Sequence, residues 1–394
     1  MKKIISFLLA GALFIITAAV LNANIEAKLE ETADISGKNL NYIGGLDKIN
    51  QPELLGQIID EDTVVMLGSS ELPYYDEVSH PMIVTNYGHS DFNIMQIGVG
   101  HIQSLAHAIN VGGLDQYIEN RKVVLNLSPQ WFSLEGINPD AFSSRFSPRM
   151  LEAFIENDNL SAELKGKILD RCRELFTSYP EGLKLIERYE DQISGKGQNT
   201  IDKIRYWLTD TIDGMKAKKD FTYVLPKEKS GTDEFVHFGE LDFSQLLKEA
   251  EAQGKAECTN NDFYIYDSYF DTYIKPTFAE LKNSYSDLSY SVSKEYDDLR
   301  LFLEVCNELN LEVMLINVPV NGFWYDYAGF PKERRAEYYQ NIRDIADEYN
   351  VSLLDLSEHE YTPYFLKDIM HMGWKGWAYI DEGIYEFYKK DLSK

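Results

Sequence analysis

The sequence predicts an α/β protein in which helices cover both faces of a mostly parallel central sheet, preceded by one membrane-spanning helix. Three observations support this fold class. Short apolar runs recur and end at glycine, serine or proline, helical patterns separate several of these runs, and a long uncharged stretch lies near the N-terminus. Strands that alternate with helices form parallel sheets with two buried faces.

The N-terminal segment sets the expected location. Residues Ile4–Ile25 carry no charge, and a helix rising about 1.5 Å per residue crosses the roughly 30 Å hydrocarbon layer over that length. Two lysines precede the run and three glutamates follow it, so the N-terminus is expected in the cytoplasm and the remainder outside the cell. The alternative is a cleaved signal peptide with its site near Asn22, although the apolar region of such peptides is usually shorter. In both alternatives the body of the protein is exported.

Three segments follow from this interpretation. Residues 1–25 form the cytoplasmic tip and transmembrane anchor, residues 26–60 a polar stalk or lead-in, and residues 61–394 one extracellular domain. Its expected strands are residues 63–67, 92–97, 122–127, 311–318 and 351–356. Its expected helices are residues 101–109, 278–310, 331–349 and a C-terminal amphipathic helix that ends near residue 388.

Residues at about 147–220 have a different texture, with long helical patterns and few strand signals, and are predicted to be a helical insertion. Residues 221–273 are polar and aromatic and show no clear period.

The charge balance excludes one class of partner. The chain has 38 basic and 64 acidic residues, a net charge of -26, and nucleic-acid binding depends on neutralising phosphates with Lys and Arg. The three cysteines have neither the spacing of a zinc site nor that of a disulfide framework. A dinucleotide fingerprint is also incomplete, because Gln103 replaces its third glycine. We therefore expect no metal and no cofactor.

A candidate nucleophile follows the first predicted strand. The apolar run closes at Gly68 and presents two hydroxyls, Ser69 and Ser70, at the strand end where open α/β sheets bind ligands. If a helix begins there, its N-terminal N–H groups can stabilise a developing oxyanion. The same letters also serve as an ordinary turn or helix cap, and the sequence does not decide which serine faces the site.

A candidate base lies near the C-terminus, where His371 follows Asp368 by three residues. On one turn, the carboxylate can orient the imidazole and leave its second nitrogen free to deprotonate a serine. Alone, such a pair is as often a capping or surface pair. Combined with a serine after the first strand, it predicts a Ser70–His371–Asp368 triad.

Four features together resemble the DltD family of teichoic-acid modification. They are the stretch 68–72 (Gly-Ser-Ser-Glu-Leu, with Glu71), the Asp368–His371 pair, the segment 126–132 (Asn-Leu-Ser-Pro-Gln-Trp-Phe) and the single N-terminal span. The resemblance implies an exported three-layer sandwich like that of SGNH hydrolases. It also implies Ser70 as nucleophile, His371 as general base and Asp368 as its partner. The implied function is transfer of D-alanine onto lipoteichoic acid. The implied partners are a membrane-bound O-acyltransferase and the D-alanyl carrier protein.

The sequence departs from the wider SGNH pattern. Ser69 stands where the superfamily has Asp, and the later Gly-x-Asn-Asp block is absent. The sequence therefore does not identify the groups that would donate hydrogen bonds to an oxyanion. Gly98 or Gly100 can offer a backbone N–H or simply form a tight turn, and Gln130 can offer a side-chain amide or be a surface residue.

Two alternatives to the acyltransferase remain. An esterase or thioesterase would use the same triad with water as acceptor. A non-catalytic docking protein would bind the carrier protein or the O-acyltransferase through the helical insertion.

Overall fold

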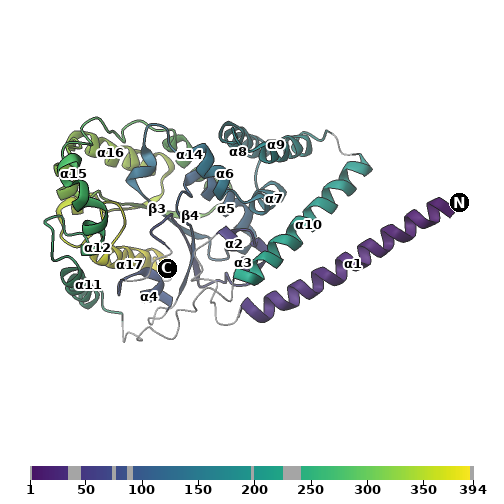
Figure 1. Ribbon diagram of the computed structural model, residues 1–394, viewed down its shortest axis with the longest axis horizontal. Coiled ribbons are helices and arrows are strands. Elements are labelled where there is room, and N and C mark those ends of the chain that lie inside the picture. The colour runs from purple at the N-terminus through teal and green to yellow at the C-terminus, as the bar shows by residue number, and fades with distance from the viewer. Residues whose placement is uncertain are drawn as a thin grey trace.

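The computed structural model describes residues 2–33, 46–72, 77–86, 92–196, 199–224 and 241–390 (Figure 1). Its strands are β1 (Thr63–Leu67), β2 (Asn93–Ile97), β3 (Lys122–Leu127), β4 (Glu312–Asn317) and β5 (Ser352–Asp355). They form one sheet in the order β2-β1-β3-β4-β5, and each neighbouring pair is parallel. The predicted α/β class with a parallel central sheet is confirmed.

Both faces of the sheet are buried, which explains why its strands read as continuous apolar runs. In β1, Val65 and Leu67 face one hydrophobic cluster, while Val64 and Met66 face the other. This alternation follows from the two-residue repeat of a strand. The register pairs Val65 with Met95 in β2 and with Val123 in β3, so these neighbouring strands end at a common edge.

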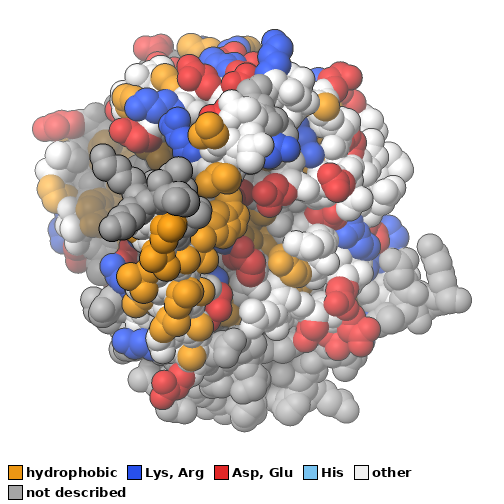
Figure 2. Space-filling model, turned by 90° about the vertical axis from the view of Figure 1, so that its right-hand side faces the viewer, with side chains coloured by type: hydrophobic (Ala, Val, Ile, Leu, Met, Phe, Trp, Pro, Cys, Tyr) orange, Lys and Arg blue, Asp and Glu red, His pale blue; other side chains and the backbone are white. Residues whose placement is uncertain are grey.

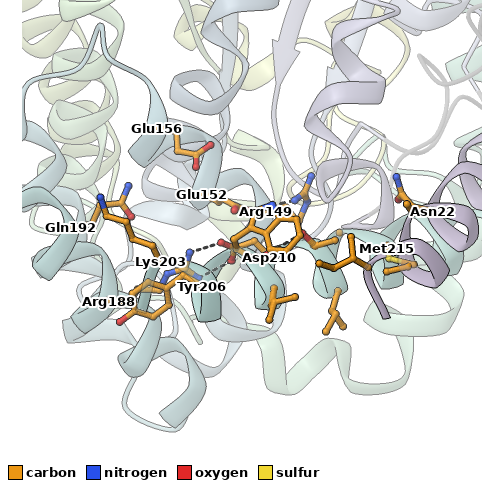
Figure 3. A pocket seen from close by; sticks show the side chains of 18 of the residues that line it. Asn22, Arg149, Glu152, Glu156, Arg188, Gln192, Lys203, Tyr206, Asp210 and Met215 are labelled. Carbon is orange, nitrogen blue, oxygen red and sulfur yellow. Dashed lines mark hydrogen bonds and ion pairs between the residues drawn. The ribbon is translucent and has the colours of Figure 1, made fainter. Parts of the chain in front are cut away.

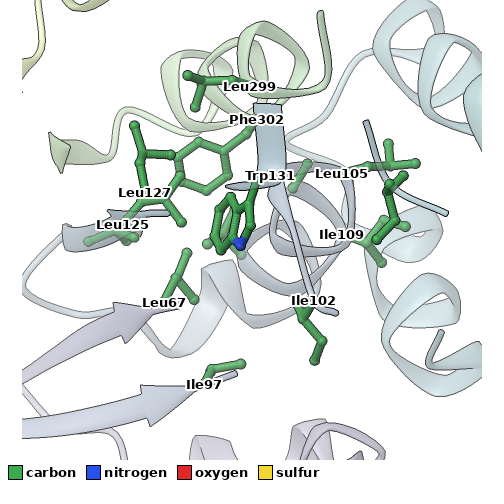
Figure 4. Close-up of a cluster of buried hydrophobic side chains, with 14 of the residues drawn as sticks. Leu67, Ile97, Ile102, Leu105, Ile109, Leu125, Leu127, Trp131, Leu299 and Phe302 are labelled. Carbon is green, nitrogen blue, oxygen red and sulfur yellow. The ribbon is translucent and has the colours of Figure 1, made fainter. Parts of the chain in front are cut away.

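Helices complete three layers (Figure 1). The first cluster includes side chains of α5 (Ser104–Leu114), α14 (Glu295–Glu308) and α16 (Lys332–Tyr349). The second includes side chains of α4 (Pro81–Asn86) and α17 (Trp374–Lys389), and α11 (Phe243–Glu257) packs on the outside of α17. Figure 4 shows the first cluster around Trp131, which lies between the strand ends and α5 and α14.

The range predicted as a helical insertion contains α7 (Pro148–Glu156), α8 (Ala162–Leu175), α9 (Pro180–Ile193) and α10 (Thr200–Val224). The range predicted as a polar lead-in contains α2 (Leu46–Ile49) and α3 (Pro52–Gly56), whose Leu54 and Leu55 are buried in the main core. The shorter helices are α6 (Pro139–Arg145), α12 (Asp267–Tyr269), α13 (Phe278–Leu281) and α15 (Gly322–Ala328).

One long predicted helix, residues 278–310, is wrong. The structure has α13 and α14 there, separated by turns over residues 282–294. The separating segment is rich in serine, and its hydroxyls bind nearby backbone groups: Ser289 accepts the N–H of Ser291, and Ser293 accepts that of Glu295. Such local bonds compete with helix formation.

Helix α5 begins three residues later than predicted, because His101 adopts a left-handed backbone with φ of 72°. Helix α11 lies in the range where the sequence showed no clear period.

Helix α1 (Lys2–Ala33) projects from the body and contains the predicted anchor (Figure 1). Its residues Leu9–Leu29 form a candidate membrane span, and none of that window is buried inside the protein. The side from which α1 projects carries a band of hydrophobic side chains among scattered charged ones (Figure 2). Helix α1 contributes exposed apolar residues that include Leu9, Leu13 and Val20.

Two glycines differ in the space around them, Gly98 being closely packed and Gly166 open, and this difference is testable. A Cβ on Gly98 would lie 2.1 Å from the Gly68 carbonyl oxygen, whereas one on Gly166 in α8 would meet nothing within 4 Å. Gly98→Ala should therefore destabilise the protein by about 1–3 kcal/mol. Gly166→Ala, the control, should stabilise it slightly, since Ala favours a helix by about 1 kcal/mol over Gly. Thermal unfolding of the detergent-purified protein measures both, and equal melting temperatures would contradict the predicted contact.

Candidate active site

Ser70 lies just beyond the carboxyl end of β1, in a turn. The Gly68 N–H donates to the carbonyl of Ile97 in β2, and the Leu72 N–H donates to the carbonyl of Ser69. Residues 69–72 form this turn, and the next helix in the part of the chain that the structure describes is α4, which begins at Pro81. In the described residues, the position of the candidate nucleophile is thus fixed by the end of the neighbouring strand.

Asp368 and His371 occupy a tight loop immediately before α17. An isolated bridge between Leu366 and Met372 closes the loop. Asp368 Oδ1 accepts the backbone N–H groups of Met370 and His371, each at 2.8 Å. The carboxylate therefore braces the loop that carries the imidazole and fixes its orientation.

The structure brings the three predicted residues together in one hydrogen-bonded chain. Ser70 Oγ lies 2.8 Å from His371 Nε2, and His371 Nδ1 lies 2.7 Å from Asp368 Oδ2. The side chains of His371 and Asp368 are 25% and 5% exposed. Ser69 points elsewhere, with its Oγ 3.5 Å from the carbonyl of Val99. Of the two serines, Ser70 is the one that reaches the imidazole.

The surroundings of His371 raise its pKa. Burial is the largest influence and acts to lower the pKa, because it disfavours the charged ring. The hydrogen bond and negative charge of Asp368 act in the opposite direction, as does the charge of Glu71, while Lys367 opposes them. The net pKa lies above the ordinary histidine value. His371 is therefore a stronger base than a free imidazole once it has lost its proton.

Three residues that sequence reasoning missed hold the Ser70 turn in place. Glu71 Oε1 accepts the Ser69 N–H at 2.9 Å and the Asn126 side-chain amide at 2.8 Å. His107 Nε2 lies 2.9 Å from the Gly68 carbonyl oxygen. Glu71 and Asn126 belong to the two motifs that carried the family resemblance, so the signal was present in the sequence without its structural role.

Four histidines lie close together in the sequence, at positions 80, 89, 101 and 107, and the described ones differ in burial. His107 and His80 are fully buried, and burial lowers the pKa of each to about 3. His101 is exposed, and His89 lies outside the described residues. His107 is thus a neutral ring, and donation from its Nε2–H to Gly68 fits that state.

The candidate oxyanion donors take different positions. Gly100 adjoins the nucleophile, since a Cβ placed on it would lie 3.6 Å from Ser70 Cβ. Gly98 instead packs behind the turn, against the Gly68 carbonyl. Gln130 is half-buried on the 3₁₀ turn that follows β3. The geometry favours Gly100 as the glycine nearer the reacting hydroxyl.

A cavity of about 410 Å³ opens beside His371. Its lining combines acidic, aromatic and apolar side chains: Glu71, Glu77, Glu257, Tyr266, Tyr269, Tyr273, Lys367, Asp368, His371, Met372, Trp374 and Trp377. The tryptophans are buried and form both cavity wall and core. The hydrogen-bonded chain therefore lies at the edge of a space large enough for a small acyl group.

A larger cavity of about 590 Å³ lies between α1 and α10 and shares no lining residue with this one (Figure 3). Charged residues form much of it, and Arg188 pairs there with Asp210. Its lining contains neither serine nor histidine, so the candidate catalytic residues lie beside the smaller cavity.

Comparison with known proteins decides the family. Residues 48–389, well over half of the chain, match the family model described as DltD protein. This chain belongs to the DltD family. It is 32% identical over 395 residues to Protein DltD of Bacillus subtilis (strain 168), covering 98% of this chain and 96% of that relative. The family has a role in D-alanylation of teichoic acids, and this chain shares that role.

Two further DltD relatives are more distant. Protein DltD of Staphylococcus aureus (strain NCTC 8325 / PS 47) is 28% identical, over 80% of this chain and 78% of the relative. Protein DltD of Lacticaseibacillus rhamnosus is 27% identical, over 84% and 78%. The resemblance first drawn from short motifs therefore extends over most of the chain.

Asp368→Asn should lower the pKa of His371, because the hydrogen bond to a charged partner is lost while burial of the ring continues to lower the pKa. A pH titration by NMR of protein with ¹³C-labelled histidine measures this change. Asp344→Asn, at an exposed helix carboxylate that accepts a hydrogen bond from Gln340, should leave the titration of His371 unchanged. An unaltered titration in Asp368→Asn would argue against the contact in solution.

Proposed function

We propose that this DltD-family chain is a membrane-anchored serine acyltransferase that transfers D-alanine to lipoteichoic acid through an acyl-Ser70 intermediate. The observation that supports this best is the hydrogen-bonded chain from Ser70 through His371 to Asp368 at the edge of a cavity. A serine, a base and an orienting carboxylate in this order are what nucleophilic acyl transfer requires.

The proposed reaction has two balanced halves. His371 Nε2 takes the proton of Ser70 as Oγ attacks the carbonyl carbon of a D-alanyl ester or thioester. The carbon–heteroatom bond of the donor then breaks, and the leaving group receives the proton from His371. In the second half, His371 takes the proton of a hydroxyl of the glycerol-phosphate polymer as that oxygen attacks the carbonyl carbon of the acyl-serine. The bond between this carbon and Ser70 Oγ then breaks, and His371 returns the proton to Ser70 Oγ.

Stabilisation of the negative oxygen formed in each half falls to groups around the Ser70 turn. We assign this role first to the backbone N–H of Gly100, which lies beside Ser70. The Gln130 side chain, at the same edge of the sheet after β3, is a second candidate donor. Donors fixed in position before reaction act without reorganisation.

The proposed location follows from the N-terminal helix. With the lysines before it in the cytoplasm, the body lies on the outer face of the cell membrane. There it would act with the membrane-bound O-acyltransferase and the D-alanyl carrier protein of the same modification. Anchoring donor, acceptor and enzyme at one surface raises their effective concentrations and favours transfer to the polymer over loss to water.

Ser70→Ala should lower D-alanine esterification of lipoteichoic acid by about a thousandfold or more, because removal of a triad nucleophile abolishes covalent catalysis. Ser69→Ala is the matched control and should retain activity, because the Ser69 hydroxyl lies 3.5 Å from the Val99 carbonyl oxygen and is no part of the chain from Ser70 to Asp368. Both are measured as ester-linked D-alanine on the polymer in cells that express each variant at equal level.

The outcomes separate the alternatives. Full D-alanylation in Ser70→Ala would rule out the nucleophile and favour a docking protein. Free D-alanine without alanylated polymer, from the purified wild-type protein supplied with donor and polymer, would favour a hydrolase.

An anionic acceptor needs a local cation near Ser70, and Arg145 at the end of α6 is placed to supply it. Its Nε–H donates to the Gly100 carbonyl at 2.9 Å, and Gly100 adjoins Ser70. Among the residues that the structure describes, Arg145 forms no ion pair. Its guanidinium can therefore pair with a phosphate of the polymer while a neighbouring hydroxyl approaches the acyl-serine.

Arg145→Ala should reduce transfer to the polymer by about tenfold, the size of a charged hydrogen bond, and leave acylation of Ser70 by the donor within twofold. Arg334→Ala is the control, since Arg334 also binds only backbone carbonyls, of Ser286 and Leu288. Acylation is followed by intact-protein mass spectrometry and transfer by alanylated polymer. An equal loss in both halves would assign Arg145 to the fold of the loop instead.

A further inference from the structure

The cavity beside His371 has an unbalanced charge. Four carboxylates line it, from Glu71, Glu77, Glu257 and Asp368, against one lysine, Lys367. Lys367 Nζ already pairs with Glu77 at 2.6 Å, and Asp368 binds His371. The remaining negative charge repels phosphate and attracts a cationic group, so this space fits the acyl donor better than the anionic polymer.

Glu71 is a buried carboxylate of this group whose two oxygens differ in their contacts. The residue is 6% exposed. Its Oε1 is occupied by the Ser69 N–H and by the Asn126 amide. Its Oε2 has no hydrogen-bond or ion-pair partner in the part of the chain that the structure describes. A buried carboxylate without a cationic partner costs folding free energy, and a bound cation would offset that cost.

Glu71 is also close to the reacting groups. A Cβ on Gly68, two residues before Ser70, would lie 2.5 Å from Glu71 Oε1. The negative charge of Glu71 raises the pKa of His371. Its effect is smaller than that of burial, which lowers this pKa, and smaller than that of Asp368, which raises it. The carboxylate therefore lies against the turn that carries Ser70 and lines the cavity.

We propose that Glu71 is a substrate-binding residue whose Oε2 holds the α-ammonium of an aminoacyl donor while Ser70 attacks the adjacent carbonyl. This proposal rests on the proposed function and deepens it by naming the residue that recognises the α-ammonium of the D-alanyl donor. The α-ammonium stands only two bonds from the carbonyl carbon, so its binding site has to adjoin the nucleophile. Glu71 is the residue directly after Ser70.

The alternative is that Glu71 only braces the Ser70 turn through Oε1. Glu71→Gln separates the two roles. A glutamine oxygen can still accept both hydrogen bonds on the Oε1 side, whereas the negative charge on the cavity side is removed. If Glu71 only stabilises the Ser70 turn, Glu71→Gln should keep its function. If Glu71 binds the α-ammonium, Glu71→Gln should lose that binding.

The experiment compares binding of two neutral-pH ligands to the full-length protein in detergent, without turnover. D-Alaninamide carries the α-ammonium, and D-lactamide has a hydroxyl in its place. Calorimetric or ligand-observed NMR titration should show the wild-type protein binding D-alaninamide about tenfold or more tightly than D-lactamide. Glu71→Gln should lose about tenfold or more for D-alaninamide and less than about twofold for D-lactamide.

Glu249→Gln is the matched control. It makes the same change at a partly exposed carboxylate of α11 that also accepts a hydrogen bond from a side-chain amide, that of Gln245, and that is no part of the cavity lining. Its affinities for both amides should equal those of the wild-type protein.

Three results overturn the proposal. These are no preference of the wild-type protein for the ammonium ligand, the same preference in Glu71→Gln, or an equal loss of both ligands in Glu71→Gln. Because binding requires no catalysis, the result is independent of the Ser70 test. Full D-alanylation in Ser70→Ala would refute the transferase mechanism and would leave the measured ammonium site standing.

Discussion

The 2.8 Å contact between Ser70 Oγ and His371 Nε2 joins residues 301 positions apart in the chain, and the remainder of the site depends on it. It forms because parallel strands end at a common edge and the loop before α17 returns to that edge. The Ser70 turn is then held from three sides. The end of β2 binds the Gly68 N–H, α5 supplies His107 to its carbonyl, and β3 supplies Asn126 to Glu71.

Part of this arrangement could be predicted because buried parallel strands have a simple hydrophobic pattern in the sequence. Their two covered faces require continuous apolar runs, and the runs end where the chain turns. Ser70 follows such an end, so its placement at the binding edge required no knowledge of side-chain contacts. The Asp368–His371 spacing was equally informative, since a pair three residues apart needs only a local turn to meet.

The remainder depended on weaker or longer-range signals. Helix α11 was missed because its buried face consists of Leu246, Ala250 and Gly254, and two small residues leave little hydrophobic periodicity. The helix predicted over 278–310 was interrupted by serine hydroxyls that bind local backbone groups. Glu71 belongs to the motif at residues 68–72, but its role could not be seen in the sequence, because its contact with Asn126 spans 55 positions and exists only in the folded chain.

The position of Glu71 links substrate binding to the base. An unpaired carboxylate near His371 raises the pKa of the ring, after the larger effects of burial and Asp368, and so favours the protonated form, which cannot deprotonate Ser70. An ammonium bound to Glu71 would cancel that share of the effect and lower the pKa of His371. The base would then lose its proton more readily when an aminoacyl donor is in place than when the site holds only water. In the proposed mechanism, the negative charge of Glu71 selects the aminoacyl donor, and it also keeps more of His371 protonated and inactive when no donor is bound.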